Sequence, residues 1–345
     1  MIKLKDLLKE NKRLTHILLK EDEAQAQQII QQFLDQKDQD LSLIGATVSS
    51  LPDNLEVPNN LNLERSTLTS LPSGLKVGKW LTLNKTKIET LPDDFKEVGT
   101  LFAYNSALKS IPQGFKANYL ILAGSQIETL PNNLQVKNTL NVSNNPLRVV
   151  PRGLKASEAI FSETKISTIP ADIEVDTLDV SHTNVKSLPN GLSLKSLNLE
   201  GAPIEALPNG FTLEGFLNLR DTRIKILPTG LKVGGFFSIK GCKSITSLPD
   251  DIQLGDDVDL DYSGITSLPA GFTVKGSLGL TFTKIKTLPA KLKARELDIS
   301  DTEIEDLPAD LKVGRLYAFR TPLSKKYTLK QLKAMFPKIR DLQIT

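Results

Sequence analysis

Residues 217–236 read LNLRDTRIKILPTGLKVGGF, and most of the chain is built from copies of this unit. Leu217 and Leu219 alternate with polar residues, which is the period-two pattern of a strand with one buried face. Pro228 removes a backbone donor and ends the strand, and Gly230 permits the turn that brings the chain back. One unit cannot bury its own apolar face, so the sequence predicts a stack of such units.

The unit recurs every 19–21 residues, and Leu217 is taken as position 1 of its copy. The strands are predicted to start at Leu41, Leu61, Leu81, Leu101, Leu120, Leu140, Ala159, Leu178, Leu197, Leu217, Phe237, Val258, Leu278, Leu297 and Leu316. Position 12 holds fourteen of the nineteen prolines, namely Pro52, Pro72, Pro92, Pro112, Pro131, Pro151, Pro170, Pro189, Pro208, Pro228, Pro249, Pro269, Pro289 and Pro308. This regularity predicts a solenoid of 14 to 15 repeats over residues 41–323.

Each column of the repeat has a physical role. Positions 1, 3, 8, 11, 15 and 17 are mostly aliphatic or Phe, and they are expected to form a shared core. Position 6 is mostly Ser or Thr, as at Thr222, and these hydroxyls are expected to bond buried backbone groups from one turn to the next. Cys242 occupies the same column, so it is predicted to be a buried structural residue. A single cysteine also excludes an internal disulfide.

The two ends of the chain depart from the repeat. Residues 1–40 carry leucines and isoleucines at helical spacing, which predicts a pair of short helices, with a break near residues 20–22, that cap the first repeat. Residues 324–345 form the other predicted cap. There Thr328 is expected to begin a helix that runs to Phe336, and a short terminal strand is expected to follow.

The repeats, as in LTLNKTKIETLPDDF (81–95) and LNLRDTRIKILPTGL (217–231), resemble the leucine-rich-repeat family. The short repeat with Leu-Pro after the strand is similar to the repeat domains of secreted bacterial type III effectors and to repeats encoded by many bacteria and phages. The resemblance implies a solenoid with one parallel β-sheet on a concave face and an extended, polyproline-like convex side. The chain departs from the effectors at position 6, where Thr or Ser replaces their usual Asn, and in carrying one Leu-Pro feature instead of two.

Composition limits the class of function. The chain is 39% hydrophobic and 24% charged with a net charge of +3, which is typical of a folded, soluble protein and gives no general reason to bind nucleic acid. It contains no apolar stretch long enough for a signal peptide or a membrane span. We therefore predict no membrane contact, and a protein that is cytoplasmic or exported without a cleaved signal peptide.

The sequence offers no catalytic or metal-binding motif. It has no phosphate-binding glycine loop, no Cys/His spacing suited to a metal and no G-x-S-x-G. Some effectors with similar repeats add a ubiquitin-ligase domain with a catalytic cysteine, but only about 22 residues follow the repeats here and Cys242 lies inside them. The prediction is a protein that is not an enzyme and has neither cofactor nor metal.

Residues at positions 2, 4, 5 and 20 are expected on the concave face, where the core does not need them. A first, aromatic group consists of Trp80, Phe102, Tyr104, Tyr119 and Ile121. Exposed aromatic clusters are typical of protein-binding hot spots. Two other interpretations stay open, namely that the N-terminal helices cover these rings or that the rings only pack on one another.

A second group on the same face combines acids with aromatic residues. It consists of Phe216, Phe236, Asp257, Asp259, Asp261, Tyr262, Phe282, Asp298 and Tyr317. Its spacing matches no calcium loop, so a surface that attracts a basic partner is favoured over a Ca²⁺ site.

The sequence therefore predicts a non-catalytic binding scaffold whose partner is another protein, and its finer form is a bacterial or phage protein that acts on a host. One alternative is a carbohydrate- or surface-binding repeat protein, in which the aromatic residues stack on sugars. A less favoured alternative is nucleic-acid binding through the basic segment 320–345, which has seven Lys or Arg against the single acid Asp341.

Overall fold

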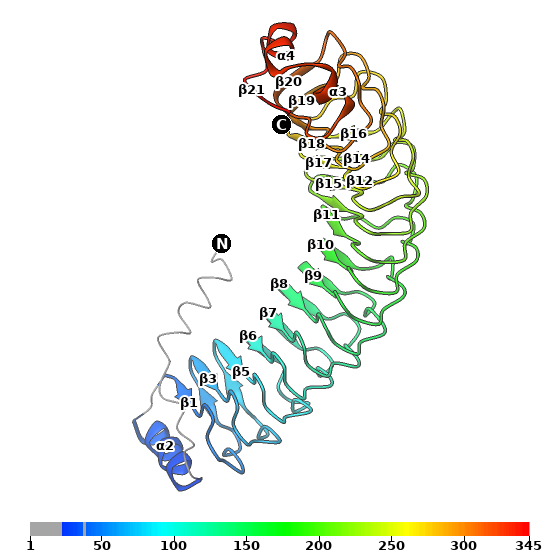
Figure 1. The fold of residues 1–345 in the computed structure, drawn as a ribbon. Coiled ribbons are helices and arrows are strands. Elements are labelled where there is room, and N and C mark those ends of the chain that lie inside the picture. Colours follow the sequence, from blue (N-terminus) through cyan, green and yellow to red (C-terminus); the bar gives the residue numbers. More distant parts are fainter. Residues whose placement is uncertain (1–22, 37–38, 345) are drawn as a thin grey trace. The chain divides into compact units, whose positions relative to one another are not determined.

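The structure is a computed structural model that describes residues 23–36 and 39–344 of the chain. It separates into two compact units, residues 1–126 and 127–345. The helix predicted before residue 20 lies outside the described residues. Both units are stacks of short parallel strands, as predicted (Figure 1).

The first unit stacks its repeats through a main parallel sheet. Its strands are β1 (Leu41–Ser42), β3 (Asn60–Asn62), β5 (Trp80–Thr82), β6 (Glu97–Phe102) and β7 (Lys116–Ile121). Position 1 of each repeat pairs with position 1 of the next, as Leu61 pairs with Leu81 and Leu81 with Leu101. The predicted register is therefore confirmed in this unit, although β3, β5, β6 and β7 begin one to four residues before the predicted starts.

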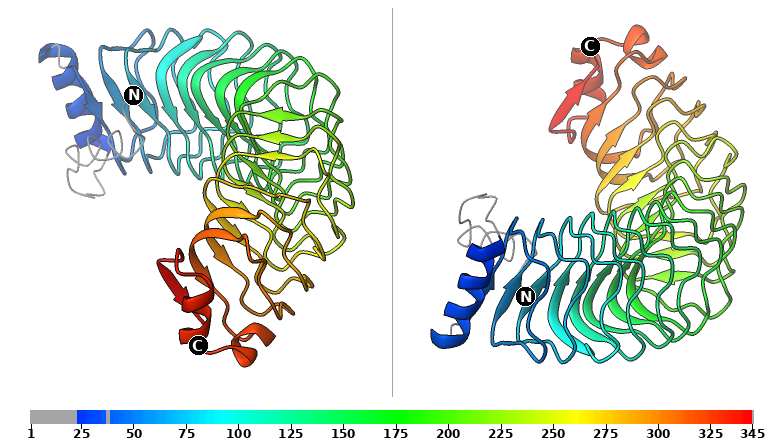
Figure 2. Two further views of the ribbon diagram at one scale, coloured as in Figure 1. Left: turned by 90° about the horizontal axis from the view of Figure 1, so that it is seen from above. Right: turned by 90° about the horizontal axis from the view of Figure 1, so that it is seen from below.

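The second unit continues the same pattern over more repeats. Its main-sheet strands are β8 (Gln135–Asn141), β9 (Lys155–Ile160), β10 (Glu174–Asp179), β11 (Ser196–Asn198), β13 (Leu217–Asn218), β15 (Phe237–Ser238), β17 (Val258–Asp259), β18 (Ser277–Gly279), β19 (Lys293–Asp298), β20 (Lys312–Tyr317) and β21 (Asp341–Gln343). Leu217 pairs with Leu197 on one side and with Phe237 on the other. The strands lie side by side within the unit (Figure 2).

The core lies between the main sheet and the returning chain. Leu217, Leu219 and Ile224 are fully buried, as their columns predict. On the returning side the chain is extended, and in places it forms narrow sheets of its own. These consist of β2 (Glu56–Val57) with β4 (Lys76–Val77), and of β12 (Thr212–Leu213), β14 (Lys232–Val233) and β16 (Gln253–Leu254). Repeats stacked in register bring these extended segments close enough to pair.

A left-handed backbone at position 5 ends each strand, and sequence reasoning did not foresee it. The φ angle is +52° at Asn105, +55° at Asp221 and +54° at His182. The reason is a tight turn, in which the Asp221 N–H donates to the Lys240 carbonyl at 2.9 Å and the Thr222 N–H donates back to the Leu219 carbonyl at 3.2 Å. Because L-residues seldom adopt this conformation, position 5 favours Gly and Asn unless another requirement prevails.

The hydroxyls of position 6 serve mainly their own repeat. Thr222 Oγ1 donates to the Leu219 carbonyl three residues back at 2.8 Å, and the same bond recurs in most other repeats. The expected bonding from turn to turn is found at Ser106 and Ser125, whose oxygens are 3.1 Å apart. Cys242 is buried and donates to the Leu219 carbonyl at 3.0 Å, and burial raises the pKa of its thiol.

Helices close both ends of the described chain. Helix α2 (Glu23–Gln36) lies beside β1 and buries Ala26, Ile30 and Phe33 (Figure 1). At the other end, α4 (Leu329–Met335) begins after Thr328 as predicted, with a capping box to Gln331. No helix in the described ranges combines the length and the apolar content needed to cross a membrane.

The C-terminal cap also contains a short helix, α3 (Pro322–Lys326), that the sequence did not predict. Thr321 caps it by accepting from the Ser324 N–H at 3.1 Å. The same hydroxyl still donates to the Ala318 carbonyl at 3.0 Å, which is the usual bond of position 6. Because Thr321 matches position 6 of the repeat, its second role as a helix cap could not be predicted from the sequence.

Candidate functional site

The open face of the main sheet, defined as the face that carries positions 2 and 4, is the candidate functional surface. Position 2 is less free than expected, because its side chain holds the backbone in place. Asn218 Oδ1 accepts from the Arg220 N–H at 3.1 Å, and Asp259 Oδ1 accepts from the Asp261 N–H at 3.1 Å. The same bond is made by Asn62, Asn141, Asp179, Asn198, Ser238 and Asp298.

Where position 2 cannot accept this bond, the preceding repeat can supply the acceptor. Phe102 stands at position 2, and the Tyr104 N–H donates instead to Asn84 Oδ1 at 2.8 Å. Tyr317 stands there too, and the Phe319 N–H donates to Ser300 Oγ at 3.1 Å. An acceptor at position 4 that precedes an aromatic position 2 is thus a signal that sequence reasoning missed.

The first aromatic surface lies in the first unit. Trp80 packs edge-on against Phe102, with ring centroids 6.4 Å apart and planes at 87°. Phe102 is only 7% exposed, which agrees for this ring with the interpretation that the rings pack on one another. Tyr104 is 49% exposed with α2 in place, whereas Tyr119 and Ile121 are half-buried. Tyr104 is the ring of this group that is most open to a partner.

A shallow hollow of about 310 Å³ lies beside these rings, along the row where Trp80, Thr100 and Tyr119 face one another across β5, β6 and β7. Its lining consists of Gly78, Lys79, Trp80, Gly99, Thr100, Asn118 and Tyr119. A Cβ on Gly78 would come within 1.9 Å of the Pro58 carbonyl oxygen, so the close approach of the repeats requires glycine there. The hollow is small, mostly uncharged and flanked by two aromatic rings.

The second predicted surface lies in the second unit and contains two ring pairs. Tyr262 and Phe282 stack with centroids 4.6 Å apart and planes at 15°, and they are 44% and 48% exposed. Tyr317 and Phe319 stack at 6.3 Å and 24°. Phe236 is also exposed, at 40%, but Phe216 is half-buried.

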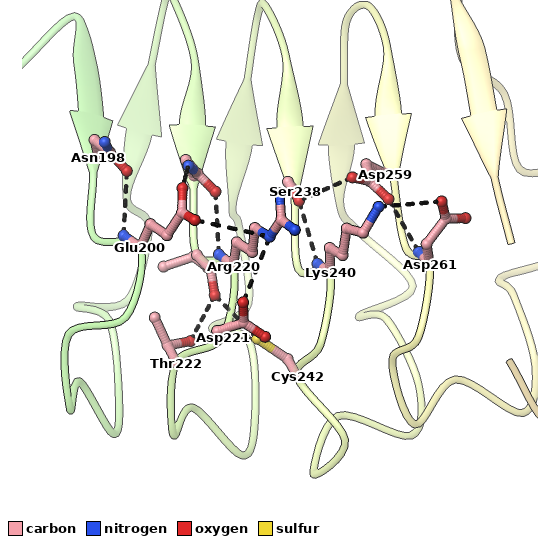
Figure 3. A network of polar contacts seen from close by, with 12 residues as sticks. Asn198, Glu200, Arg220, Asp221, Thr222, Ser238, Lys240, Cys242, Asp259 and Asp261 are labelled. Atoms are coloured by element: carbon pink, nitrogen blue, oxygen red, sulfur yellow. Dashed lines mark hydrogen bonds and ion pairs between the residues drawn. The ribbon is translucent and has the colours of Figure 1, made fainter. Parts of the chain in front are cut away.

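The cations around this surface are already engaged by acids. Figure 3 shows Arg220 and Lys240 in one row with Glu200 and Asp261, where Lys240 Nζ lies 3.7 Å from Asp261 Oδ2. Further along, Arg295 pairs with Asp257 at 3.4 Å, and Arg320 holds Asp301 through two hydrogen bonds.

Two carboxylates of this surface lie outside these ion pairs, although Lys240 and Arg220 act electrostatically on Asp259, and Asp298 acts on Arg320. In the part of the chain that the structure describes, neither Asp259 nor Asp298 forms an ion pair. Burial, followed by the nearby charge of Asp261, raises the pKa of Asp259. Within residues 23–36 and 39–344, no group of three or more His, Cys, Asp or Glu is placed to hold a metal ion.

No protein-family model and no curated protein sequence matches the chain. Solved structures do match. YopM of Yersinia pestis, described as a leucine-rich effector protein, is 18% identical with a TM-score of 0.50, and the match covers 98% of this chain and 97% of that one. A leucine-rich-repeat protein of Leptospira interrogans is 18% identical with a TM-score of 0.45, over 94% and 100% of the two chains.

The Drosophila Toll–Spätzle complex is another similar structure, at 17% identity and a TM-score of 0.50, over 77% of this chain and 41% of that one. At these identities the likeness concerns the fold. The strand register within each unit, the repeated Leu-Pro turns and the two neighbours with a TM-score of 0.50 together show that the chain has the fold of a leucine-rich-repeat solenoid.

Proposed function

We propose that this chain is a non-catalytic scaffold that binds another protein on the open face of its first unit. The observation that carries the proposal is Tyr104, whose ring is 49% exposed two residues after β6, one of the strands that line the hollow between Trp80 and Tyr119. Aromatic side chains around a small depression are the usual centre of a protein-binding hot spot, because they bury much area at a low entropic cost.

The similar structures support the proposal at the level of the fold. The Drosophila protein is Toll in complex with Spätzle, and the Yersinia pestis protein is an effector. A bacterial or phage protein that acts on a host is the finer form of the proposal. It is compatible with a location in the cytoplasm or with export that needs no cleaved signal.

Carbohydrate binding is a second candidate, and it is favoured by the lining of the hollow. Trp80 and Tyr119 offer rings on which a sugar can stack, and Thr100 and Asn118 offer polar groups between them. Its volume of about 310 Å³ is at the low end for a small-molecule site. A glycan would be displaced by free sugars, whereas a protein partner would not.

The test is quantitative capture of proteins from extracts of the source organism and of its host cells by the full chain and by two variants. Tyr104→Ala removes the exposed ring, and we expect it to reduce recovery of the partner about tenfold or more. Ile226→Ala is the control, because Ile226 is 78% exposed but lies outside both aromatic surfaces. Equal loss in both variants, or no loss in Tyr104→Ala, would contradict the proposal.

A further inference from the structure

The second unit displays an aromatic part of its open face that no segment covers in the described structure. Its prominent rings, Tyr262 and Phe282, are 44% and 48% exposed and stack at the spacing of neighbouring strands. Both occupy position 5, with φ of +55° and +56°. Some other repeats place Asn105, Asn144 or Gly124 there, which adopt this conformation more readily, whereas others place charged or polar side chains such as Arg65 or His182. The chain therefore displays two rings where the backbone favours smaller residues.

The charge beside these rings indicates what can cover them. Asp259 and Asp298 stand at position 2 of their repeats, and Gly279 lies between them in the register of the sheet. Neighbouring strands are about 4.8 Å apart, so a cation above Gly279 would lie roughly 5 Å from each carboxylate. Lys240, Arg295 and Arg320 cannot take that place without leaving the acids with which they pair.

Position 279 carries no side chain between the two acids for a reason that the structure shows. Asp261 Oδ1 crosses to the next repeat and accepts from the Thr281 N–H at 2.8 Å. A Cβ on Gly279 would lie 2.8 Å from that oxygen, so a side chain at this position would displace the bond. The glycine is consequently required by the hydrogen bonding of the sheet, and the Asp261 carboxylate stands beside it as a third acid.

The rings favour one kind of cation. Lys240 already places its ammonium 5.6 Å from the centroid of the Tyr262 ring, so this surface accommodates a cation above an aromatic face. An arginine can stack its planar guanidinium on a ring and direct several N–H donors of fixed geometry at a carboxylate, whereas the lysine ammonium acts as a point charge.

We propose that Asp259, Tyr262, Phe282, Asp298 and Tyr317, here named the acidic aromatic surface, bind an arginine-containing extended segment of a partner protein. The guanidinium groups stack on Tyr262 and Phe282 and direct their N–H donors toward Asp259 and Asp298 across Gly279. The proposal extends the scaffold function to a second surface. It rests on residues of the second unit alone, so it can succeed or fail independently of Tyr104.

The experiment measures the Kd of the full chain for a fluorescein-labelled decapeptide of alternating Arg and Ser, by fluorescence anisotropy at low salt. Decapeptides that alternate Lys or Gln with Ser are compared. We expect binding in the order Arg, Lys and then Gln, with weakening as salt is added. Equal binding of the Arg and Gln peptides would overturn the proposal.

The decisive variant is Asp259→Asn with Asp298→Asn, which should raise the Kd for the Arg peptide about tenfold or more. It should fold, because Asn62, Asn141, Asn198 and Asn218 hold the same position and make the same backbone bond. The matched control, Glu205→Gln with Asp250→Asn, changes the net charge equally at exposed residues elsewhere. If the control weakens binding as much, the effect is one of net charge and the proposal fails.

A second pair of changes tests the rings. Tyr262→Asn with Phe282→Asn suits the left-handed backbone, so thermal unfolding should be preserved, while the preference for Arg over Lys should disappear. A preference that survives would contradict the role of the rings.

Two results would show that something other than an arginine-containing segment binds the acidic aromatic surface, and either would overturn the proposal. A single-stranded oligonucleotide that competes with the Arg peptide would point to nucleic acid. Light scattering measures the molar mass of the chain. A molar mass that increases with concentration, and no longer does so in Asp259→Asn with Asp298→Asn, would assign the surface to a second copy of the chain. Tyr104→Ala should leave the Kd for the peptide unchanged.

Discussion

At the scale of single residues, a binding group can be recognised because it lowers the stability of the folded chain. Asp259 keeps the bond to the Asp261 N–H that an Asn at position 2 would also make, but it adds a charge that burial and Asp261 disfavour. Its pKa is raised in the folded state, so the unfolded chain holds fewer protons at mildly acidic pH and stability falls as pH rises through that raised pKa. The cost is then fully present at neutral pH.

We therefore expect Asp259→Asn to raise the free energy of unfolding at pH 7 by up to about 0.5 kcal/mol, the usual limit for a surface substitution. The gain should shrink as pH falls through the raised pKa and vanish below about pH 3, where the carboxyl is protonated in both states. Thermal unfolding of both proteins between about pH 3 and pH 8 measures it. A gain that is independent of pH would show that charge is not its cause.

Asp301 provides a control of opposite sign. Hydrogen bonds from Arg320 hold the pKa of Asp301 below its usual value. A lowered folded pKa gives a contribution that is present above the ordinary pKa and is lost as pH falls through the lowered one. Asp301→Asn should therefore lower stability at pH 7, opposite to the change at Asp259.

At the scale of strands, an aromatic residue at position 2 depends on the hydrogen-bond acceptor at position 4 of the preceding repeat. Asn84→Ala should leave the Tyr104 N–H without its acceptor, at a cost of about 1 kcal/mol. Amide hydrogen exchange at Tyr104 should accelerate, and partner capture should weaken because the ring is less fixed. Asn84→Asp keeps an acceptor and should restore both. Unchanged exchange in Asn84→Ala would show that the bond contributes nothing.

The leucine and proline columns predict the register of the strands, because burial and proline geometry act within each repeat. They do not show by themselves that Phe102 is buried, because this depends on contact with Trp80 on the neighbouring strand β5. Nor do they reveal the left-handed position 5, which is occupied by residues as different as Arg65, His182 and Phe282. Candidate residues could thus be chosen from the sequence, but their exposure depends on bonds and contacts between repeats.

At the scale of the whole molecule, each repeat contacts mainly its neighbours, so repeats are separable parts. Deleting residues 217–236 would bring Leu197 beside Phe237 and Glu200 beside Lys240, which replaces Arg220 as its cation. We expect a folded chain of lower thermal stability that still binds the Arg peptide, as measured by circular dichroism and anisotropy. Aggregation or lost peptide binding would show that the repeats are not separable.

This use of position 4 as a substitute acceptor for position 2 also predicts an order of substitutions in evolution. An aromatic residue that arises first at position 2 leaves a backbone N–H without an acceptor, whereas an Asn or Ser that arises first at the preceding position 4 does no harm. Asn84 should therefore be older than Phe102, and Ser300 older than Tyr317. A new aromatic residue at position 2 is therefore expected to arise where the preceding repeat already carries the acceptor that supports it.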